Sequence, residues 1–416
     1  MRYFVYVVCG EKAYTEQLNF SLKYLRYHSR YPILVLTDSS RNQGPVHHPQ
    51  EYIIDIRTPQ NLSNNQASIF LETSLPRYLP NPESAVYCYL DSDVIAISDA
   101  INNVFEELKS WPLFADDHCS IDYHSPYALH CGCKQAFDYR RNAWQFIKNT
   151  IPEPENETEK RRTALQQIFH AYKKQPLRHS ADILQYLFNR YLSAKSSFTI
   201  EKSYHFDKIT RTWHQDGYLI DYDRKYYLRK MRKQYGFMPA SAHWQDKNGT
   251  KLIPETPHCS HLREFLENDS GLCIPADFRH WNGGVFLFDN QSFPAFETWH
   301  YHSSRLMKNP RLANKYIDQL SLIITAFEHD FQHKKRLPVK YNFITDFDNK
   351  EVAYHPDKGY TYNGFQTAFA PAFLHVYHRW GQKNWSVWQA VEAHGIKHGI
   401  ITRNDLKNKS LFGGTE

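Results

Sequence analysis

The segment from Ala85 to Asp99, AVYCYLDSDVIAISD, constrains the fold more than any other part of the chain. Its apolar and aromatic run from Val86 to Leu90 is typical of a buried β-strand. Asp91 and Asp93 follow this run, and residues two apart share one face of an extended backbone. Paired carboxylates at a strand end can bind Mg²⁺ or Mn²⁺ and leave positions for phosphate oxygens. They can equally form an acidic turn that caps the next helix, so the motif alone leaves both interpretations open.

Strands and helices alternate on the N-terminal side of this motif. Short apolar runs predict strands, and leucines at helical spacing predict the first helix. The expected strands cover 3–8, 33–37 and 52–56, and the expected helices cover 14–28 and 67–79. This alternation predicts a mainly parallel sheet with ligands beyond the carboxyl ends of its strands. By this rule residues 9–14, Asp38, Asp91 and Asp93 lie at one edge of the sheet.

The alternation stops after an expected helix at 101–109 and an expected strand at 112–114, and it resumes at Trp281. We therefore expect an insertion of mixed structure, with a hairpin turn at Asp216-Gly217 and helices at 143–149, 157–172 and 182–193. The expected organisation is a first half at 1–115, an insertion at 116–280, a second half at 281–390 and a C-terminal tail at 391–416.

Paired glycines open the second half. Asn282, Gly283 and Gly284 precede an expected strand at 285–288. Adjacent glycines let a ligand approach the backbone, and the asparagine amide is both a donor and an acceptor. The same three residues also occur in simple tight turns.

Two later segments carry further polar residues. Asp318 and Gln319 begin an expected helix that extends to about residue 329, where an aspartate also interacts favourably with the helix dipole. An expected strand at 372–377 carries His375 and leads to His378. Both segments therefore have a structural explanation as well as a functional one.

The composition restricts the classes of function. The chain has 416 residues, of which 41% are hydrophobic and 15% aromatic, as in folded proteins and in many clefts that bind carbohydrate. A net charge of +6 permits an anionic ligand or peripheral contact with a membrane, and it does not require nucleic acid. No apolar run is long enough to span a membrane, and the start lacks a signal-peptide pattern. Seven cysteines, an odd number, favour a reducing compartment, so we expect a cytoplasmic protein.

These segments, in this order, resemble those of the GT-A glycosyltransferases, most closely glycosyltransferase family eight and its relatives. The resemblance rests on YLDSDV at 89–94, WNGGVFLFD at 281–289, DQ at 318–319, LPVKYN at 337–342 and the ending at 375–385. It implies an α/β, Rossmann-like GT-A domain with a large mixed insertion. It also implies transfer of a sugar from a nucleotide-diphosphate sugar, with a UDP-sugar as the expected donor. The implied acceptor is a glycan or glycolipid, and the implied stereochemistry is retention.

The resemblance also assigns roles to residues. Mn²⁺ or Mg²⁺ would be bound by Asp91, Asp93 and a late histidine. His375 is preferred because it ends a strand, whereas His378 has the family's spacing to the following glycine. By the same resemblance, Asp318 and Gln319 are the expected catalytic residues at the donor sugar. The residues expected to contact the rest of the donor are Tyr14, Asp38, Asp91, Asn282, Gly283, Gly284 and Lys383.

Departures from the family pattern keep two other functions open. Glu72 stands where a basic residue is common, and Asn384 replaces a proline. A non-catalytic protein of the same fold that binds nucleotide sugars would explain both departures. A phosphatase with Asp91 as nucleophile is the weaker alternative, because Ile95 replaces the Thr or Val expected four residues later.

The insertion is rich in aromatic and basic residues, so we expect it to provide the acceptor side. Its basic cluster could bind an anionic acceptor or lipid headgroups, or form a solvated face; it comprises Arg224, Lys225, Arg229, Lys230, Arg232 and Lys233. Cysteines and histidines also gather at 118–133 and 258–273, without the C-x₂-C spacing of known zinc motifs. Buried thiols and hydrogen-bonded histidines are therefore the expected explanation.

Overall fold

The computed structural model divides the chain into two compact units. Unit 1 comprises Met1–Cys133 and Pro257–Glu416, and unit 2 comprises Lys134–Thr256. The structure describes residues 1–109, 111–154, 158–241, 243–253, 257–313, 316–346, 352–362, 370–403 and 405–406. Each hydrophobic core of the described residues lies within one unit.

A six-stranded sheet forms the centre of unit 1, with strand order β3-β2-β1-β4-β14-β6. The first four strands are parallel, and β14 is antiparallel to both β4 and β6. The strands are β1 (Arg2–Val8), β2 (Ile33–Thr37), β3 (Ile53–Asp55), β4 (Val86–Leu90), β6 (Leu113–Ser120) and β14 (Arg279–Phe288). The α/β class expected from the sequence is confirmed.

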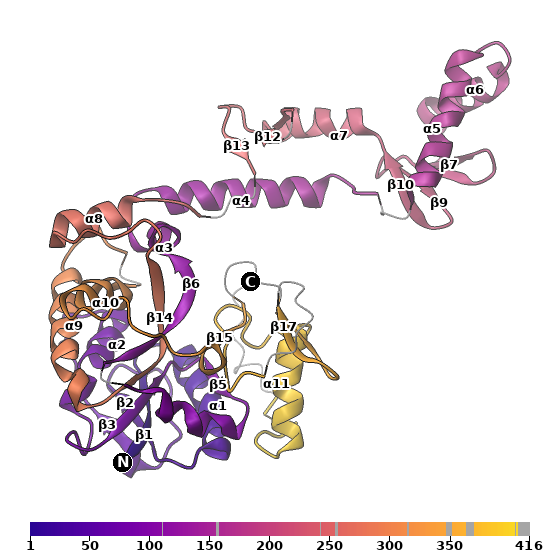
Figure 1. Cartoon of the computed structure of the whole chain (residues 1–416). Coiled ribbons are helices and arrows are strands. Elements are labelled where there is room, and N and C mark those ends of the chain that lie inside the picture. Colours follow the sequence, from indigo (N-terminus) through magenta and orange to yellow (C-terminus); the bar gives the residue numbers. More distant parts are fainter. Residues whose placement is uncertain are drawn as a thin grey trace. The chain divides into compact units, whose positions relative to one another are not determined.

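Helices cover both faces of this sheet, because alternate residues of each strand point to opposite sides. On β1, Phe4 and Tyr6 pack in one core while Val5 and Val7 pack in the other. The first core includes α1 (Lys12–His28) and α11 (Ser386–Lys397), and the second includes α2 (Asn64–Thr73), α9 (Phe293–Leu306) and α10 (Ile317–Glu328) (Figure 1). The central strands β2 and β4, and β1 after Arg2, are therefore almost entirely apolar.

A small second sheet follows the Asp91–Asp93 motif. It consists of β15 (Phe343–Ile344), β18 (Phe373–His375) and β5 (Val94–Ala96), and His375 pairs with Val94. This pairing fixes His375 beside Asp93. Unit 1 also contains α3 (Ile121–Ala128), α8 (His261–Ser270), β16 (Val352–His355), β17 (Gly359–Tyr362) and the 3₁₀ segments η1 (Gln50–Tyr52), η2 (Leu75–Arg77), η3 (Asp99–Glu107), η7 (Asn290–Ser292) and η8 (Val339–Tyr341).

Unit 2 has cores of its own. A four-stranded antiparallel meander buries Phe206 and Trp213 against α5, and a second small core contains Ile147 and Met231. The expected hairpin turn is confirmed, with φ of 53° at Asp216 and 85° at Gly217. The elements are α4 (Cys133–Thr150), α5 (Glu159–Lys174), α6 (Ser180–Leu187), the π-helical turns η5 (Phe188–Leu192) and η6 (Met231–Tyr235), β7 (Ser197–Ile200), β8 (Tyr204–Asp207), β9 (Thr212–Gln215), β10 (Tyr218–Tyr222), α7 (Arg224–Lys230), β11 (Met238–Pro239), β12 (Trp244–Gln245) and β13 (Lys251–Leu252).

The observed boundaries differ from the expected ones. Residues 116–133 and 257–280 belong to unit 1 rather than to an insertion at 116–280, because β6 continues to Ser120 along β14. The expected helix at 67–79 ends at Thr73, since Pro76 lacks a backbone donor and the chain tightens into η2. The segment expected at 101–109 is a 3₁₀ helix. Glu157, the expected start of α5, lies outside the described residues.

The expected C-terminal tail at 391–416 begins inside a helix. α11 runs to Lys397, and its Val387, Trp388 and Val391 are fully buried. Residues 407–416 of the expected tail lie outside the described residues. Across the described part of the chain, no helix has both the length and the apolar character needed to cross a membrane.

Candidate active site

A cavity of about 210 Å³ lies in unit 1 where β1 and β4 end. Most of the site residues expected from the sequence line it. They are Tyr14, Asp91, Asp93, Asn282, Gly283, Asp318, Gln319 and His375. Residues far apart in the sequence therefore meet at the carboxyl edge of the parallel strands, where α/β proteins bind ligands.

Asp91, Asp93 and His375 form the centre of the cavity wall. One ligand atom from each lies within 4.8 Å of the others. His375 Nε2 lies 3.2 Å from Asp93 Oδ1, at ion-pair distance, and both buried atoms lack any other hydrogen-bond partner among the described residues. The Tyr89 hydroxyl donates a 2.7 Å hydrogen bond to Asp91 Oδ1. Two oxygen ligands and one imidazole nitrogen suit Mn²⁺ or Mg²⁺, so the residues present fit such an ion.

A hydrogen-bond chain fixes the orientation of His375. Its Nδ1 lies 2.9 Å from Asn342 Oδ1, and the Asn342 amide nitrogen donates to Asn282 Oδ1 at 2.9 Å. Because Asn342 Oδ1 is an acceptor, Nδ1 carries a proton and Nε2 is the nitrogen that faces Asp93. A metal ion would therefore be bound by Nε2, after loss of its proton.

The paired glycines make room for the histidine. β14 bulges between Asn282 and Phe286, and the Gly284 carbonyl accepts a 2.8 Å hydrogen bond from the Asp91 backbone. A Cβ atom at Gly284 would lie 2.4 Å from His375 Cε1. Gly284 therefore allows a side chain of the protein, rather than a ligand, to approach the backbone.

The cavity is strongly acidic. Glu72 faces it together with Asp91, Asp93 and Asp318, and no Lys or Arg of the described residues lines it. Burial and the neighbouring Asp93 raise the pKa of Asp91 to about 7, and burial raises that of Asp318 to about 6. Burial and the charges of Asp318 and Asp91 raise the pKa of Glu72 well above its usual value. Burial alone would lower the pKa of His375, but the nearby aspartates raise it to about 8.

The rest of the wall comes from α10, α1 and two tyrosines. Asp318 and Gln319 lie in the first turn of α10, which is anchored by a 2.7 Å hydrogen bond from Trp299 Nε1 to the Asp318 carbonyl. Tyr14, in the first turn of α1, is 47% exposed at the rim. Tyr316 and Tyr377 join through their hydroxyl groups at 2.9 Å.

Four expected site residues do not line the cavity, and one of them, Gly284, lies against His375. Asp38 is buried elsewhere; burial would raise its pKa, but hydrogen bonds from Ser40 and Thr58 hold it at about 2. Lys383 is paired with Glu392. His378 is exposed, and its backbone N–H donates to Asp346.

Sequence reasoning did not find four of the residues that shape this site. Glu72 was seen only as a departure from a family pattern, although its carboxylate faces the aspartates. Asn342, Tyr316 and Tyr377 were not singled out. Asn342 ends the LPVKYN segment, so its place in that motif was the available signal. Tyr377 had a signal too, because it lies two residues after His375 and strand alternation places both on one face. Tyr316 had none, because it approaches the cavity only through tertiary packing.

The fold and the cavity together define an α/β protein with a buried acidic ligand site. No protein-family model matches the sequence, and no curated protein matches it. WbbM, a bifunctional glycosyltransferase, aligns over 89% of this chain and 45% of its own, with 9% identity and a TM-score of 0.35. LgtC, a galactosyltransferase solved with donor and acceptor sugar analogues, aligns over 32% and 51%, with 14% identity and a TM-score of 0.21.

A third similar structure is the glycosyltransferase GlyE of Streptococcus pneumoniae TIGR4. It aligns over 29% of this chain and 30% of its own, with 22% identity and a TM-score of 0.20. The chain thus spans about half or less of the length of these glycosyltransferases. A likeness of this size does not assign an activity, so the functional argument rests on the site itself.

Proposed function

We propose that the chain is a metal-dependent glycosyltransferase that uses a nucleotide-diphosphate sugar, with a UDP-sugar as the expected donor. The observation that carries this proposal is the charge of the cavity. Four carboxylates face it, and no lysine or arginine of the described chain balances them. A diphosphate would enter such a site together with a divalent cation, because those carboxylates that are ionised repel it strongly in a buried site.

Asp91, Asp93 and His375 would hold the cation, Mn²⁺ or Mg²⁺. The close approach of their ligand atoms supports this assignment, since Asp93 Oδ1 and His375 Nε2 are buried, face each other at 3.2 Å and have no other hydrogen-bond partner among the described residues. A bound divalent cation would neutralise the charge that develops on the diphosphate leaving group. His375 is proposed as the third ligand rather than His378, which is exposed.

The other cavity residues would bind and orient the donor. Asp318 and Gln319, on the first turn of α10, are proposed to contact the donor sugar near its reacting carbon. Tyr14 at the rim would stack on the base, since an exposed aromatic ring offers a flat apolar face. Tyr316 and Tyr377 would exclude water from this side of the sugar. Retention of configuration remains part of this proposal.

Unit 2 is proposed to bind the acceptor, a glycan or glycolipid. Its α6–η5 region exposes large apolar side chains, with exposed fractions of 66% for Leu184, 55% for Phe188 and 76% for Leu192. Its basic cluster exposes Arg229, Arg232 and Lys233 among others. Apolar and cationic side chains on one unit suit a lipid-linked or anionic acceptor and peripheral contact with a membrane. We expect the transfer reaction to take place in the cytoplasm.

A non-catalytic nucleotide-sugar-binding protein is the second candidate. The pairing of Lys383 with Glu392 favours it, because the cavity then lacks a lysine for the leaving group. Turnover distinguishes the two functions, since a binding protein would be stabilised by the donor without releasing nucleoside diphosphate.

The test is nucleoside diphosphate release from a panel of nucleotide sugars, with Mn²⁺ or with a chelator. Asp91→Asn and Asp93→Asn should each abolish metal-dependent release while the far-ultraviolet circular dichroism stays unchanged. Asp99→Asn, at an exposed position, is the matched control and should remain active. Near-normal release by either cavity variant would refute the metal site.

The same assay ranks the two histidines. His375→Ala should raise the Mn²⁺ concentration needed for half-maximal release by about 10- to 100-fold, the usual cost of a disturbed metal ligand shell. His378→Ala should change it little, because this side chain is exposed. The opposite ranking would show that the spacing to the following glycine is the better guide.

A further inference from the structure

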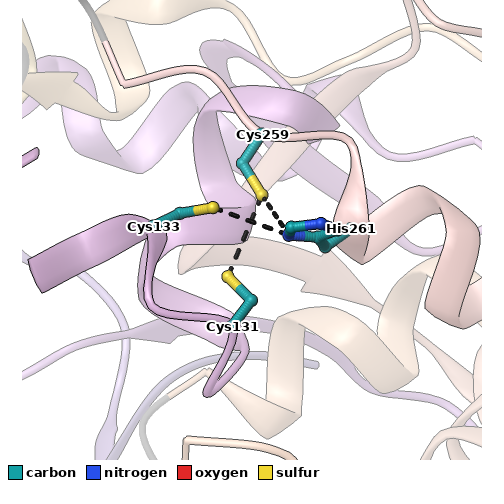
Figure 2. A group of neighbouring side chains, drawn as sticks. All are labelled: Cys131, Cys133, Cys259 and His261. Atoms are coloured by element: carbon teal, nitrogen blue, oxygen red, sulfur yellow. Dashed lines mark hydrogen bonds between the residues drawn. The ribbon is translucent and has the colours of Figure 1, made fainter. Parts of the chain in front are cut away.

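Three cysteines and a histidine of unit 1 converge outside the proposed active site. Figure 2 shows Cys131, Cys133, Cys259 and His261 pointing toward one another. The Sγ atoms of Cys131 and Cys259 are 3.9 Å apart. His261 Nδ1 lies 3.0 Å from Cys259 Sγ and 3.5 Å from Cys133 Sγ. One ligand atom from each residue lies within 4.8 Å of the others.

These spacings are those of a tetrahedral metal site. Zinc–sulfur and zinc–nitrogen bonds at tetrahedral angles place two sulfurs about 3.8 Å apart and a sulfur and a nitrogen about 3.6 Å apart. The separations of 3.9 Å and 3.5 Å agree with both values, and the 3.0 Å between Cys259 Sγ and His261 Nδ1 is shorter by about 0.6 Å. A disulfide would need sulfurs about 2.05 Å apart, and none of the seven cysteines is in a disulfide.

The local backbone brings the thiols to one point. Gly132, between Cys131 and Cys133, has φ of +83°, a left-handed conformation that glycine adopts without strain. This turn lets both thiols point to the same side. On the other segment, the Cys259 backbone N–H donates to the Asp122 carbonyl at 3.2 Å, so α3 holds the chain just before α8.

We propose that Cys131, Cys133, Cys259 and His261 bind one structural zinc ion. Thiolate and imidazole ligands favour zinc, whereas Mg²⁺ and Mn²⁺ prefer oxygen ligands like those of the acidic cavity. Four protein ligands leave no position for a substrate, which makes the site structural rather than catalytic. The proposal is independent of glycosyl transfer.

The zinc ion would join two distant parts of the sequence. Cys133 and His261 are separated by 128 positions, and the chain between them leaves unit 1 and returns to it. Each segment supplies two ligands, a C-x-C pair and a C-x-H pair. Neither pair is a zinc motif alone, so the sequence spacing favours buried thiols and hydrogen-bonded histidines. The structure favours zinc instead, because it brings the two pairs together.

The first test is the metal content of the full-length protein purified without added metal. Mass spectrometry of the metal should find about one zinc per chain. Cys133→Ser and Cys259→Ser should each retain less than half of it, while Cys273→Ser, an exposed cysteine outside the cluster, should retain it fully. The double variant Asp91→Asn/Asp93→Asn should also keep its zinc, which separates this site from the acidic cavity.

Histidine variants provide a finer test if the cysteine variants fail to fold. His261→Cys should keep the zinc in a four-thiolate site, His261→Ala should weaken binding, and His258→Ala, an exposed neighbour, should not. Wild-type protein produced with Co²⁺ should show the strong thiolate-to-cobalt absorption of a tetrahedral site, and this absorption should change in His261→Cys. Two outcomes would overturn the proposal. One is wild-type protein that contains no zinc after purification and also shows no such absorption when it is produced with Co²⁺. The other is a Cys131–Cys259 disulfide in the purified protein.

Discussion

At the scale of single residues, the position of His375 depends on the missing side chain at Gly284. Gly284→Ala should weaken Mn²⁺ binding by about tenfold or more, because its Cβ would lie 2.4 Å from His375 Cε1 and displace the ring. Titration of Mn²⁺ followed by electron paramagnetic resonance measures the effect. Gly283→Ala is the matched control, since its Cβ would lie 3.5 Å from the nearest atom, Glu72 Oε1. Equal affinities for the two variants would contradict the steric argument.

A second residue-scale prediction concerns His300. Burial and the nearby Arg77 lower its pKa to about 4, while Thr73 Oγ1 lies 2.9 Å from its Nδ1. Below about pH 6.5 the unfolded chain binds a proton that the folded chain excludes, so stability is full above that pH and falls as the pH decreases toward 4.

Lowering the pH from 7.5 to 5 should therefore reduce the free energy of unfolding by roughly 1 kcal/mol through His300, after allowance for partial solvent screening. Urea unfolding of His300→Asn should show a smaller loss over this range than the wild type. His47→Asn, at an exposed position, should lose as much as the wild type. Identical losses in all three proteins would exclude His300 as the source.

The sequence predicted some of these residues better than others. Asp91, Asp93 and His375 could be found because each follows or ends an apolar run. The link from His375 through Asn342 to Asn282 could not, since it depends on three segments that meet only in the folded chain. The burial of Asp38 away from the cavity could not be predicted either, because it too depends on contacts that form only in the folded chain.

At the scale of elements, α2 carries Glu72 into the cavity and depends on its first turn. Ser63 Oγ accepts from the Gln66 backbone at 3.3 Å, and Gln66 Oε1 accepts from the Ser63 backbone at 3.0 Å. Ser63→Ala should lower the unfolding free energy by about 1 kcal/mol, because one backbone donor loses its acceptor. Ser63→Asn should restore most of it in urea unfolding. A Ser63→Ala protein as stable as the wild type would show that the cap does not limit α2.

Elements were predictable where local chemistry decides the structure. β2 has the expected bounds, and the Asp216-Gly217 turn follows from residues that tolerate positive φ. α11 is not among the expected helices although Val387, Trp388 and Val391 have helical spacing, and the expected boundary between the second half and the tail, at 390/391, falls inside it. α2 ends before the expected residue because the chain tightens into η2 at Pro76. η3 is a 3₁₀ helix, and the spacing of apolar residues does not distinguish it from an α-helix.

At the scale of the whole molecule, the division into units predicts separate roles. Replacing Arg229, Lys230, Arg232 and Lys233 with glutamine should reduce transfer to the acceptor by about tenfold, or 1.4 kcal/mol. Donor affinity measured by calorimetry should stay within about twofold, because these residues belong to unit 2 and the cavity to unit 1.

A matched variant controls for the change in net charge. It replaces Lys160, Lys173, Lys174 and Arg178, four exposed residues of unit 2 on α5 and just beyond it. This protein should transfer as the wild type does. Loss of donor affinity in the first variant would place the basic cluster in the nucleotide site and refute the division of roles.

The convergence of Cys133 and Cys259 has a consequence for how this chain can change over generations. Because unit 2 departs and returns at neighbouring points, it occupies the place of a single surface loop in unit 1. A unit inserted between two neighbouring points can be lengthened, lost or exchanged without changes to the sheet that forms the cavity. Relatives that share the cavity are therefore expected to differ most in unit 2, and under the proposed role of unit 2, recombination at these two points would change the acceptor.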